Sequence, residues 1–201
     1  MSVGHLFNER GERLFFNEEE RRAFIEATEY ESGKAITFCR LLHYTGCKLT
    51  EALKLTPRCI DCAGRTVFFD GSVPHPRDAA RTVPAPDSFI ELLDAVHGVR
   101  RRAQTGIQAN ERIWPYHANT MTKPVLRVIA EAGITEGPHA TPMGIRYGCI
   151  VHAIRERIPL TRIKTWMGHS HINYTASLAD DLALHAPELL GDERAEAERM
   201  W

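Results

Sequence analysis

The stretch from Thr141 to Leu178 carries residue types suited to phosphate chemistry. The first arginine of this stretch, Arg146, opens a predicted helix, and a second predicted helix from about Pro159 leads to a Gly168-His169 turn. A guanidinium can fork onto two phosphate oxygens, so Arg146 and His169 could hold a phosphate group. A structural interpretation is also open: Arg146 would pair with a glutamate such as Glu51, and His169 would end a helix.

Basic residues are concentrated in the middle of the chain. The formal net charge is -1 at pH 7, which gives no argument for nucleic acid from the whole protein. Residues 100–169, however, contain eleven Lys or Arg and four Glu, whereas residues 179–201 contain seven acidic residues and two arginines. This distribution indicates a surface for a polyanion and a separate end that faces protein. Uneven charge on an ordinary solvated surface is the simpler alternative.

The composition is typical of one soluble, compact unit. The chain has 201 residues, of which 43% are hydrophobic and 25% charged, enough to bury a core. No apolar run is long enough to span a membrane and no signal-peptide pattern begins the chain, so we expect a cytoplasmic protein. The five cysteines predict reduced thiols. Cys59 and Cys62 lack the second ligand pair of a zinc site, so we expect no metal and no cofactor.

Local patterns predict a mainly helical α+β domain. Asn17 and Glu20 have the capping-box spacing, so a helix should follow them. Apolar periodicity predicts further helices at 34–44, 49–55, 87–96 and, with Pro124 in its first turn, 122–132. The polar stretch 100–109 is predicted to be a loop. Residues 65–69 and 81–84 are predicted strands of a hairpin and form a small antiparallel sheet.

The motifs and their order resemble the catalytic domain of the tyrosine recombinases, the phage integrase family, over about residues 12–178. Residues 45–53, TGCKLTEAL, look like the family's Thr-Gly-x-Arg-x-x-Glu box. Residues 141–178 look like its Leu-Arg-His and Leu-Gly-His boxes. The ending at 191–201 is similar to that of a plasmid- and transposon-borne subgroup. The resemblance implies a helical catalytic-domain fold with a small antiparallel sheet.

The resemblance also implies a domain organisation. We expect a single catalytic-domain-like unit over residues 1–201, with a core at about 12–178 and an acidic C-terminal tail at 179–201. Most of the family clamps DNA from the other side with a separate N-terminal core-binding domain, and we expect no such domain in this chain.

In this family a tyrosine hydroxyl attacks a DNA phosphate, and two arginines stabilise the charge of the transition state. The resemblance puts Lys48 at the first arginine, Arg146 at the second and His169 at the late histidine. A lysine keeps the charge but loses the planar two-point contact. Leu178 lies nine positions after His169, where the nucleophile belongs, and leucine has no nucleophilic atom.

The proton-transfer positions depart from the family as well. The hairpin lysine that acts as general acid has no counterpart, and the nearest candidates are His75 and Arg77. Met143 stands where a His or Lys precedes the second arginine, and Tyr147 stands where a His follows it. We therefore expect degenerate catalytic positions at Lys48, Met143, Tyr147 and Leu178. The expected phosphate-binding residues are Lys48, Arg146, His169, Arg77 and His75.

The leading hypothesis is a catalytically silent recombinase-like protein that acts in or regulates DNA recombination and binds double-stranded DNA weakly, in a salt-sensitive manner. One alternative is an active divergent recombinase whose nucleophile is Tyr174, about one helical turn before Leu178. Another is an interaction protein that regulates a recombinase, or binds a second copy of itself, through the tail at 179–201.

Overall fold

The computed structural model describes residues 4–71, 80–134 and 137–190. The α-helices in these ranges are α1 (Glu18–Ala27), α2 (Gly33–Thr45), α3 (Leu49–Ala52), α4 (Asp87–His97), α5 (Val99–Ala103), α6 (Ala118–Glu131), α7 (Pro142–Arg155), α8 (Leu160–Met167) and α9 (Ile172–His185). The short 3-10 helices are η1 (Thr28–Tyr30), η2 (Pro57–Cys59), η3 (Gln108–Asn110) and η4 (Pro187–Leu190), and the strands are β1 (Ile60–Asp61), β2 (Thr66–Phe69) and β3 (Arg81–Pro84). The mainly helical α+β prediction is confirmed.

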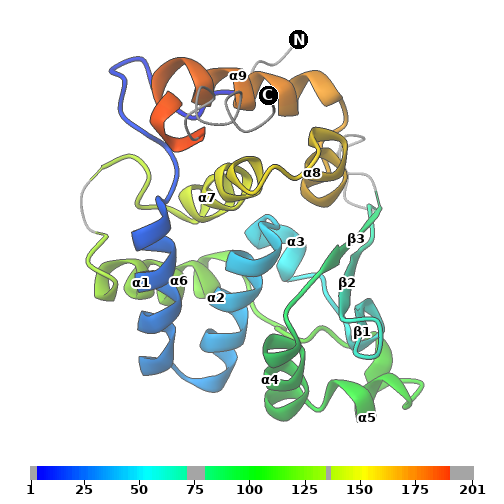
Figure 1. The fold of residues 1–201 in the computed structure, drawn as a ribbon. Coiled ribbons are helices and arrows are strands. Elements are labelled where there is room, and N and C mark those ends of the chain that lie inside the picture. The colour runs from blue at the N-terminus through cyan, green and yellow to red at the C-terminus, as the bar shows by residue number, and fades with distance from the viewer. Residues whose placement is uncertain (1–3, 72–79, 135–136, 191–201) are drawn as a thin grey trace.

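Helix α2 is the centre of the helical part, and it packs against α1, α4, α6 and α7 (Figure 1). Helix α1 begins as predicted, because the Asn17 side chain accepts from the Glu20 amide at 2.8 Å and the Glu20 carboxylate accepts from the Asn17 amide at 2.9 Å. Helix α7 lies between this group and α9, which Figure 1 shows at the top of the molecule.

The three strands form an antiparallel sheet in the order β1-β2-β3, beside the helices. Val67 pairs with Val83 and Phe69 pairs with Arg81, so the predicted hairpin is confirmed. Along β3 the side chains alternate, with Arg81 and Val83 buried and Thr82 exposed, as the period of a strand requires. Strand β3 also contacts α8. The sheet therefore presents Arg81 to the helical part of the fold.

Buried apolar residues form two clusters, and α7 contributes to both. The larger cluster lies around α2, α6 and the sheet and includes Phe38, Trp114 and Ile145. The smaller cluster joins α7, α8 and α9 and includes Ile150 and Leu178. Because Arg146 lies between Ile145 and Ile150 on α7, its guanidinium is positioned where the two clusters meet.

Two predictions about the middle of the chain were wrong. Residues 100–109, predicted to be a loop, include most of α5 and the start of η3. Helix α6 begins at Ala118, so Pro124 lies in its interior and not in its first turn. The early start buries Met121 on the same helix face as Val125 and Val128. This apolar burial offsets the hydrogen bond that a proline inside a helix cannot donate.

Smaller differences concern the ends of two helices near the site. Helix α3 ends at Ala52, not at Leu55. Helix α7 begins at Pro142, and the Thr141 hydroxyl accepts from the Gly144 amide at 3.1 Å. Arg146 therefore lies in the second turn of α7 and does not open it. Across the residues with described positions, every helix is too short or too polar to traverse a bilayer.

Candidate functional site

Arg146 is the buried centre of the candidate site. Its side chain is 6% exposed, Nη1 donates to the Gly46 carbonyl at 2.6 Å, and Nη2 donates to the Met167 carbonyl at 2.7 Å. Burial lowers the pKa of Arg146, while the nearby Glu51 carboxylate acts in the opposite direction. The guanidinium thus joins the turn after α2 to the end of α8. It does not form the direct pair with Glu51 that the structural interpretation suggested.

Glu51 pairs instead with Arg81, a residue that the sequence reasoning missed. Nη1 and Nη2 of Arg81 donate to the two carboxylate oxygens of Glu51 at 2.6 and 2.9 Å, and Nε donates to the Trp166 carbonyl at 2.8 Å. The guanidinium also lies over the Phe69 ring, 4.5 Å from its centroid. The alternation of β3 could have revealed Arg81, since a strand with Val83 inward must also point Arg81 inward.

His169 follows a left-handed turn at Gly168, where φ is 68°. Its Nδ1 lies 2.9 Å from the Thr175 hydroxyl, and its ring lies 4.7 Å from the Tyr174 ring, edge to face. Burial lowers the pKa of His169 to about 3, and the positive charges of Arg146, Arg81, Lys48 and Lys164 lower it further. His169 is therefore neutral at pH 7, and it contributes a hydrogen-bonding group but no charge.

Lys48 completes this group from the start of α3. Its backbone amide donates to a Glu51 carboxylate oxygen at 2.7 Å, and its side chain is half-buried. The charge of Lys48 is one of those that lower the pKa of His169. Arg146 bonds to the carbonyls of Gly46 and Met167, which lie two residues before Lys48 and two residues before His169, and we call the region that these three residues bound the cradle.

Tyr174 lies beside this cradle. Its ring contacts His169, it packs with Tyr147 against the smaller apolar cluster, and it acts electrostatically on Arg146. Burial, together with the interaction with Tyr174, raises the pKa of Tyr147. The N-terminal segment covers Tyr174, because a Cβ added to Gly4 would lie 2.8 Å from Cε2 of its ring.

Leu178 lies one turn further along α9, in an apolar cluster against which Tyr174 and Tyr147 also pack. It is fully buried in the smaller apolar cluster, with Leu6 and Leu182 among the members. Met143, in the first turn of α7, is 47% exposed and lies outside both clusters. His75 and Arg77 lie outside the described residues, in the connection that leads to Arg81.

Pairing within the chain reduces the basic character that the sequence suggested. Among the residues that the structure describes, at least four of the eleven basic residues between 100 and 169 form ion pairs with carboxylates. They are Arg100 with Asp94, Arg102 with Glu111, Arg127 with Glu31, and Arg155 with Glu18. Within the described ranges no group of three His, Cys, Asp or Glu side chains is arranged to hold a metal ion.

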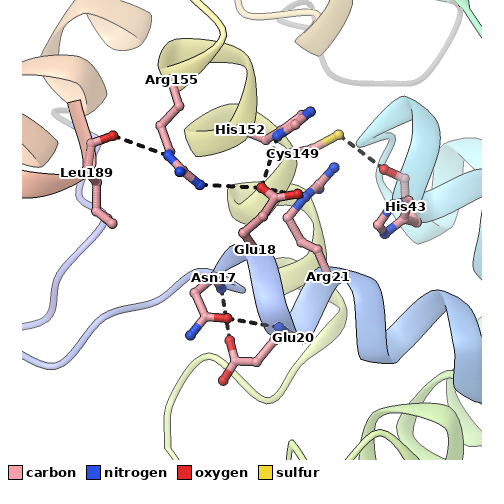
Figure 2. A network of polar contacts seen from close by, with 9 residues as sticks. All are labelled: Asn17, Glu18, Glu20, Arg21, His43, Cys149, His152, Arg155 and Leu189. Carbon is pink, nitrogen blue, oxygen red and sulfur yellow. Dashed lines mark hydrogen bonds and ion pairs between the residues drawn. The ribbon is translucent and has the colours of Figure 1, made fainter. Parts of the chain in front are cut away.

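A second polar network fixes the other half of α7 (Figure 2). One Glu18 carboxylate oxygen accepts from Nη1 of Arg155 at 3.4 Å and lies 3.0 Å from Nδ1 of His152. Nε of Arg155 donates to the Leu189 carbonyl at 3.2 Å, and the Cys149 thiol donates to the His43 carbonyl at 3.2 Å. These contacts hold α7 to α1, α2 and η4, so the helix that carries Arg146 is anchored along its length.

Comparison with known proteins identifies the fold and the family. The profile of the phage integrase family matches residues 15–182. A resolvase of Escherichia coli is 27% identical over 182 residues, which cover 81% of this chain and 69% of the resolvase. A post-cleavage complex of the XerH site-specific recombinase with DNA has a TM-score of 0.69 at 18% identity, over 87% of this chain and 51% of that one.

The catalytic domain of bacteriophage HP1 integrase covers the same region. It has a TM-score of 0.58 at 18% identity, over 88% of this chain and 96% of that domain. The chain thus spans about two thirds of the resolvase, half of the XerH chain and nearly all of the isolated catalytic domain. The profile match over residues 15–182, together with the catalytic-domain fold, shows that this chain belongs to the phage integrase family.

Proposed function

We propose that this chain binds duplex DNA weakly through the cradle around Lys48, Arg146 and His169, and that it does not cut the strand it holds. The observation that carries the proposal is the contrast between two neighbouring places. The guanidinium of Arg146 joins the segment that carries Lys48 to the segment that carries His169, whereas Leu178, where the family resemblance puts the nucleophile, is fully buried among apolar side chains.

Lys48 makes the main direct contact with phosphate in this proposal. Its side chain is half-buried, whereas Arg146 and His169 are each more than nine-tenths buried. Arg146 then acts chiefly by fixing the backbone on both sides of the cradle and by adding positive potential. Contacts to phosphate carry no sequence information, so binding is expected to be independent of DNA sequence.

The chemistry of the cradle supports holding over cutting. Phosphoryl transfer to a protein requires a nucleophilic oxygen, and Leu178 has none. Lysine at position 48 supplies charge without the two-point grip of a guanidinium. His169 is neutral at pH 7, so it cannot add charge to stabilise the transition state. Each change removes part of the machinery that the family's reaction needs.

Similar solved proteins are consistent with a role on DNA. The XerH complex is described as bound to its difH substrate, and a Tn1549 transposon integrase with a TM-score of 0.66 is described in complex with circular intermediate DNA. Because these chains are 18% and 17% identical to this one, they support the fold directly and DNA binding only as part of the proposal.

A binding titration and a cleavage assay test the proposal together. Fluorescence anisotropy with a duplex of about 30 bp should show an affinity that falls as salt is added. The slope of log affinity against log salt concentration should be about -0.9 per phosphate contact. Lys48→Ala should weaken binding, whereas Lys34→Ala, at the far end of α2, should not. A nicked suicide substrate should yield no covalent DNA–protein adduct on a denaturing gel. An adduct, or equal binding by wild type and Lys48→Ala, would overturn the proposal.

One set of contacts favours a second candidate, an active enzyme that uses Tyr174. Tyr174 interacts with Tyr147, and its ring contacts His169, 4.7 Å away between centroids. This candidate predicts nicking of supercoiled plasmid that Tyr174→Phe abolishes and Tyr30→Phe, at an exposed tyrosine, leaves unchanged. Against it, the N-terminal segment at Gly4 packs directly on the Tyr174 ring.

A further inference from the structure

Two buried guanidiniums connect the same two segments of the chain. Arg146 bonds to the carbonyls of Gly46 and Met167. Arg81 bonds to the side chain of Glu51 and the carbonyl of Trp166. Each arginine thus spans from the 46–51 segment, which carries Lys48, to the 166–169 segment, which carries His169. Arg146 makes this connection from α7, and Arg81 makes it from β3.

We infer that Arg81 and Glu51 are a positioning pair, which holds Lys48 and His169 at the separation that the DNA-binding cradle requires. The inference rests on the proposed function and assigns part of it to Arg81, which lies outside the family boxes, and to its partner Glu51, the glutamate of the box at 45–53. Arg81 is 4% exposed, and all three of its nitrogens are hydrogen-bonded within the protein. It therefore acts through Glu51 and Trp166, and not by touching phosphate.

The link from this pair to Lys48 is direct. The Glu51 oxygen that accepts from Nη2 of Arg81 also accepts from the Lys48 amide, at 2.7 Å. The carboxylate thus receives three hydrogen bonds, and Arg81 fixes its orientation by bonding to both oxygens. If the carboxylate turned, the Lys48 amide would lose its acceptor, and the start of α3 would no longer be fixed.

The link to His169 passes through Gly168. A Cβ added to Gly168 would lie 2.9 Å from Nη1 of Arg81, and the residue has a left-handed φ of 68°. The guanidinium is therefore packed against the turn that delivers His169, while its Nε holds the carbonyl of Trp166 two residues earlier. One side chain on β3 thus fixes both the turn and the helix end before it.

A lysine at position 81 would show whether the hydrogen bonds of Arg81, and not only its positive charge, hold the two segments. Arg81→Lys keeps the positive charge but can make only one point contact, so the Glu51 carboxylate and the Trp166 carbonyl cannot both be held. Arg127→Lys is the matched control, because Arg127 forms a two-point pair with Glu31 on the protein surface, away from the cradle.

Amide hydrogen exchange tests the pair without DNA. In Arg81→Lys the amide of Lys48 should exchange about tenfold faster or more, because the Glu51 carboxylate that accepts from it is no longer held by Arg81. The amide of His169 should also exchange faster. Arg127→Lys should leave both rates as in the wild type. If both amides keep their wild-type rates in Arg81→Lys, the pair does not position them and the inference is overturned.

DNA titration tests the consequence for the cradle. Arg81→Lys should bind duplex about three- to tenfold more weakly, with a salt slope smaller by about 0.9, the share of one phosphate contact. If amide exchange changes in Arg81→Lys but DNA affinity and salt slope stay as in the wild type, the inference is also overturned. If the wild-type protein binds no DNA, the proposed function fails, while the exchange experiment still decides whether the pair positions Lys48.

A second variant covers the case in which Arg81→Lys does not fold, as judged by near-ultraviolet circular dichroism. Glu51→Gln is isosteric and keeps one acceptor oxygen, so it cannot serve Arg81 at two points and the Lys48 amide as well. It should produce the same faster exchange at Lys48 and the same smaller salt slope. Wild-type exchange at Lys48 in this variant would overturn the inference.

Discussion

Nη1 of Arg146 lies 2.6 Å from the carbonyl oxygen of Gly46, a residue one hundred positions earlier in the chain. Gly46 has a left-handed φ of 59° and ends α2, so this carbonyl is one that the helix leaves without an internal partner. A side chain on α7 thus completes the C-terminus of α2, and it does so two residues before Lys48. The hydrogen bonding of a helix end and the placement of the cradle depend on the same bond.

Replacing Arg146 should therefore cost stability as well as function. Arg146→Met fills much of the volume but leaves the carbonyls of Gly46 and Met167 buried without donors. We expect a loss of roughly 3–5 kcal/mol in the free energy of unfolding, measured by urea titration at pH 7. The control is Arg155→Met, whose partly exposed pair with Glu18 should contribute less than about 1 kcal/mol. A loss below that value for Arg146→Met would contradict the structural role.

Introducing a tyrosine at position 178 should not produce cleavage. Leu178 is fully buried against the smaller apolar cluster, so the larger ring of Leu178→Tyr must overpack that cluster. We expect a stability loss of about 1–3 kcal/mol and no covalent adduct with a suicide substrate. Leu178→Met, which conserves volume, should be nearly neutral. Appearance of an adduct in Leu178→Tyr would show that the rest of the site is still competent.

Stability should fall as the pH is lowered below about 6.5. The folded protein holds the pKa of His169 at about 3, whereas an unfolded histidine titrates near 6.5. As the pH falls, the unfolded state therefore binds the proton first. The contribution of His169 to the free energy of unfolding is complete above about pH 6.5. It is lost progressively toward about pH 3, by up to about 1.4 kcal/mol per pH unit. Burial lowers the pKa of His43 and His97 too, so they add in the same direction.

Urea unfolding at several pH values from about 5 to about 7 measures how the free energy of unfolding changes with pH. This range lies above the region where carboxylates titrate. His169→Gln should make the slope shallower by up to one proton. An unchanged slope in His169→Gln would mean that His169 does not titrate as described.

The glycine before His169 should not tolerate a side chain. Gly168→Ala places a Cβ at a positive φ and 2.9 Å from the Arg81 guanidinium. We expect a loss of about 1–3 kcal/mol in thermal or urea unfolding, together with weaker DNA binding. Gly106→Ala is the control, because no atom lies within 4 Å of its added Cβ, and it should change stability by less than about 0.5 kcal/mol. Equal effects of the two substitutions would argue against a tight Gly168 turn.

Local rules predicted elements whose cause is itself local. The capping box at Asn17, the apolar spacing of α2 and α4 and the strand pattern of the hairpin each depend on residues a few positions apart, and each was predicted close to its observed bounds. The early start of α6 was not predicted, because Met121 becomes buried only when α6 packs against other elements. Helix α5 was missed for a related reason, since only Val99 of its five residues is buried.

The sequence by itself determined which chemical groups this protein has: a leucine nine positions after His169, a lysine at position 48 and a single arginine in the first half of α7. Only the tertiary structure decided which groups meet. Arg81 and Glu51 are 30 residues apart, and Arg146 and Gly46 are 100 apart. No periodicity or cap encodes such contacts, because they form when separate helices and strands bury their faces together and the buried charges must find partners.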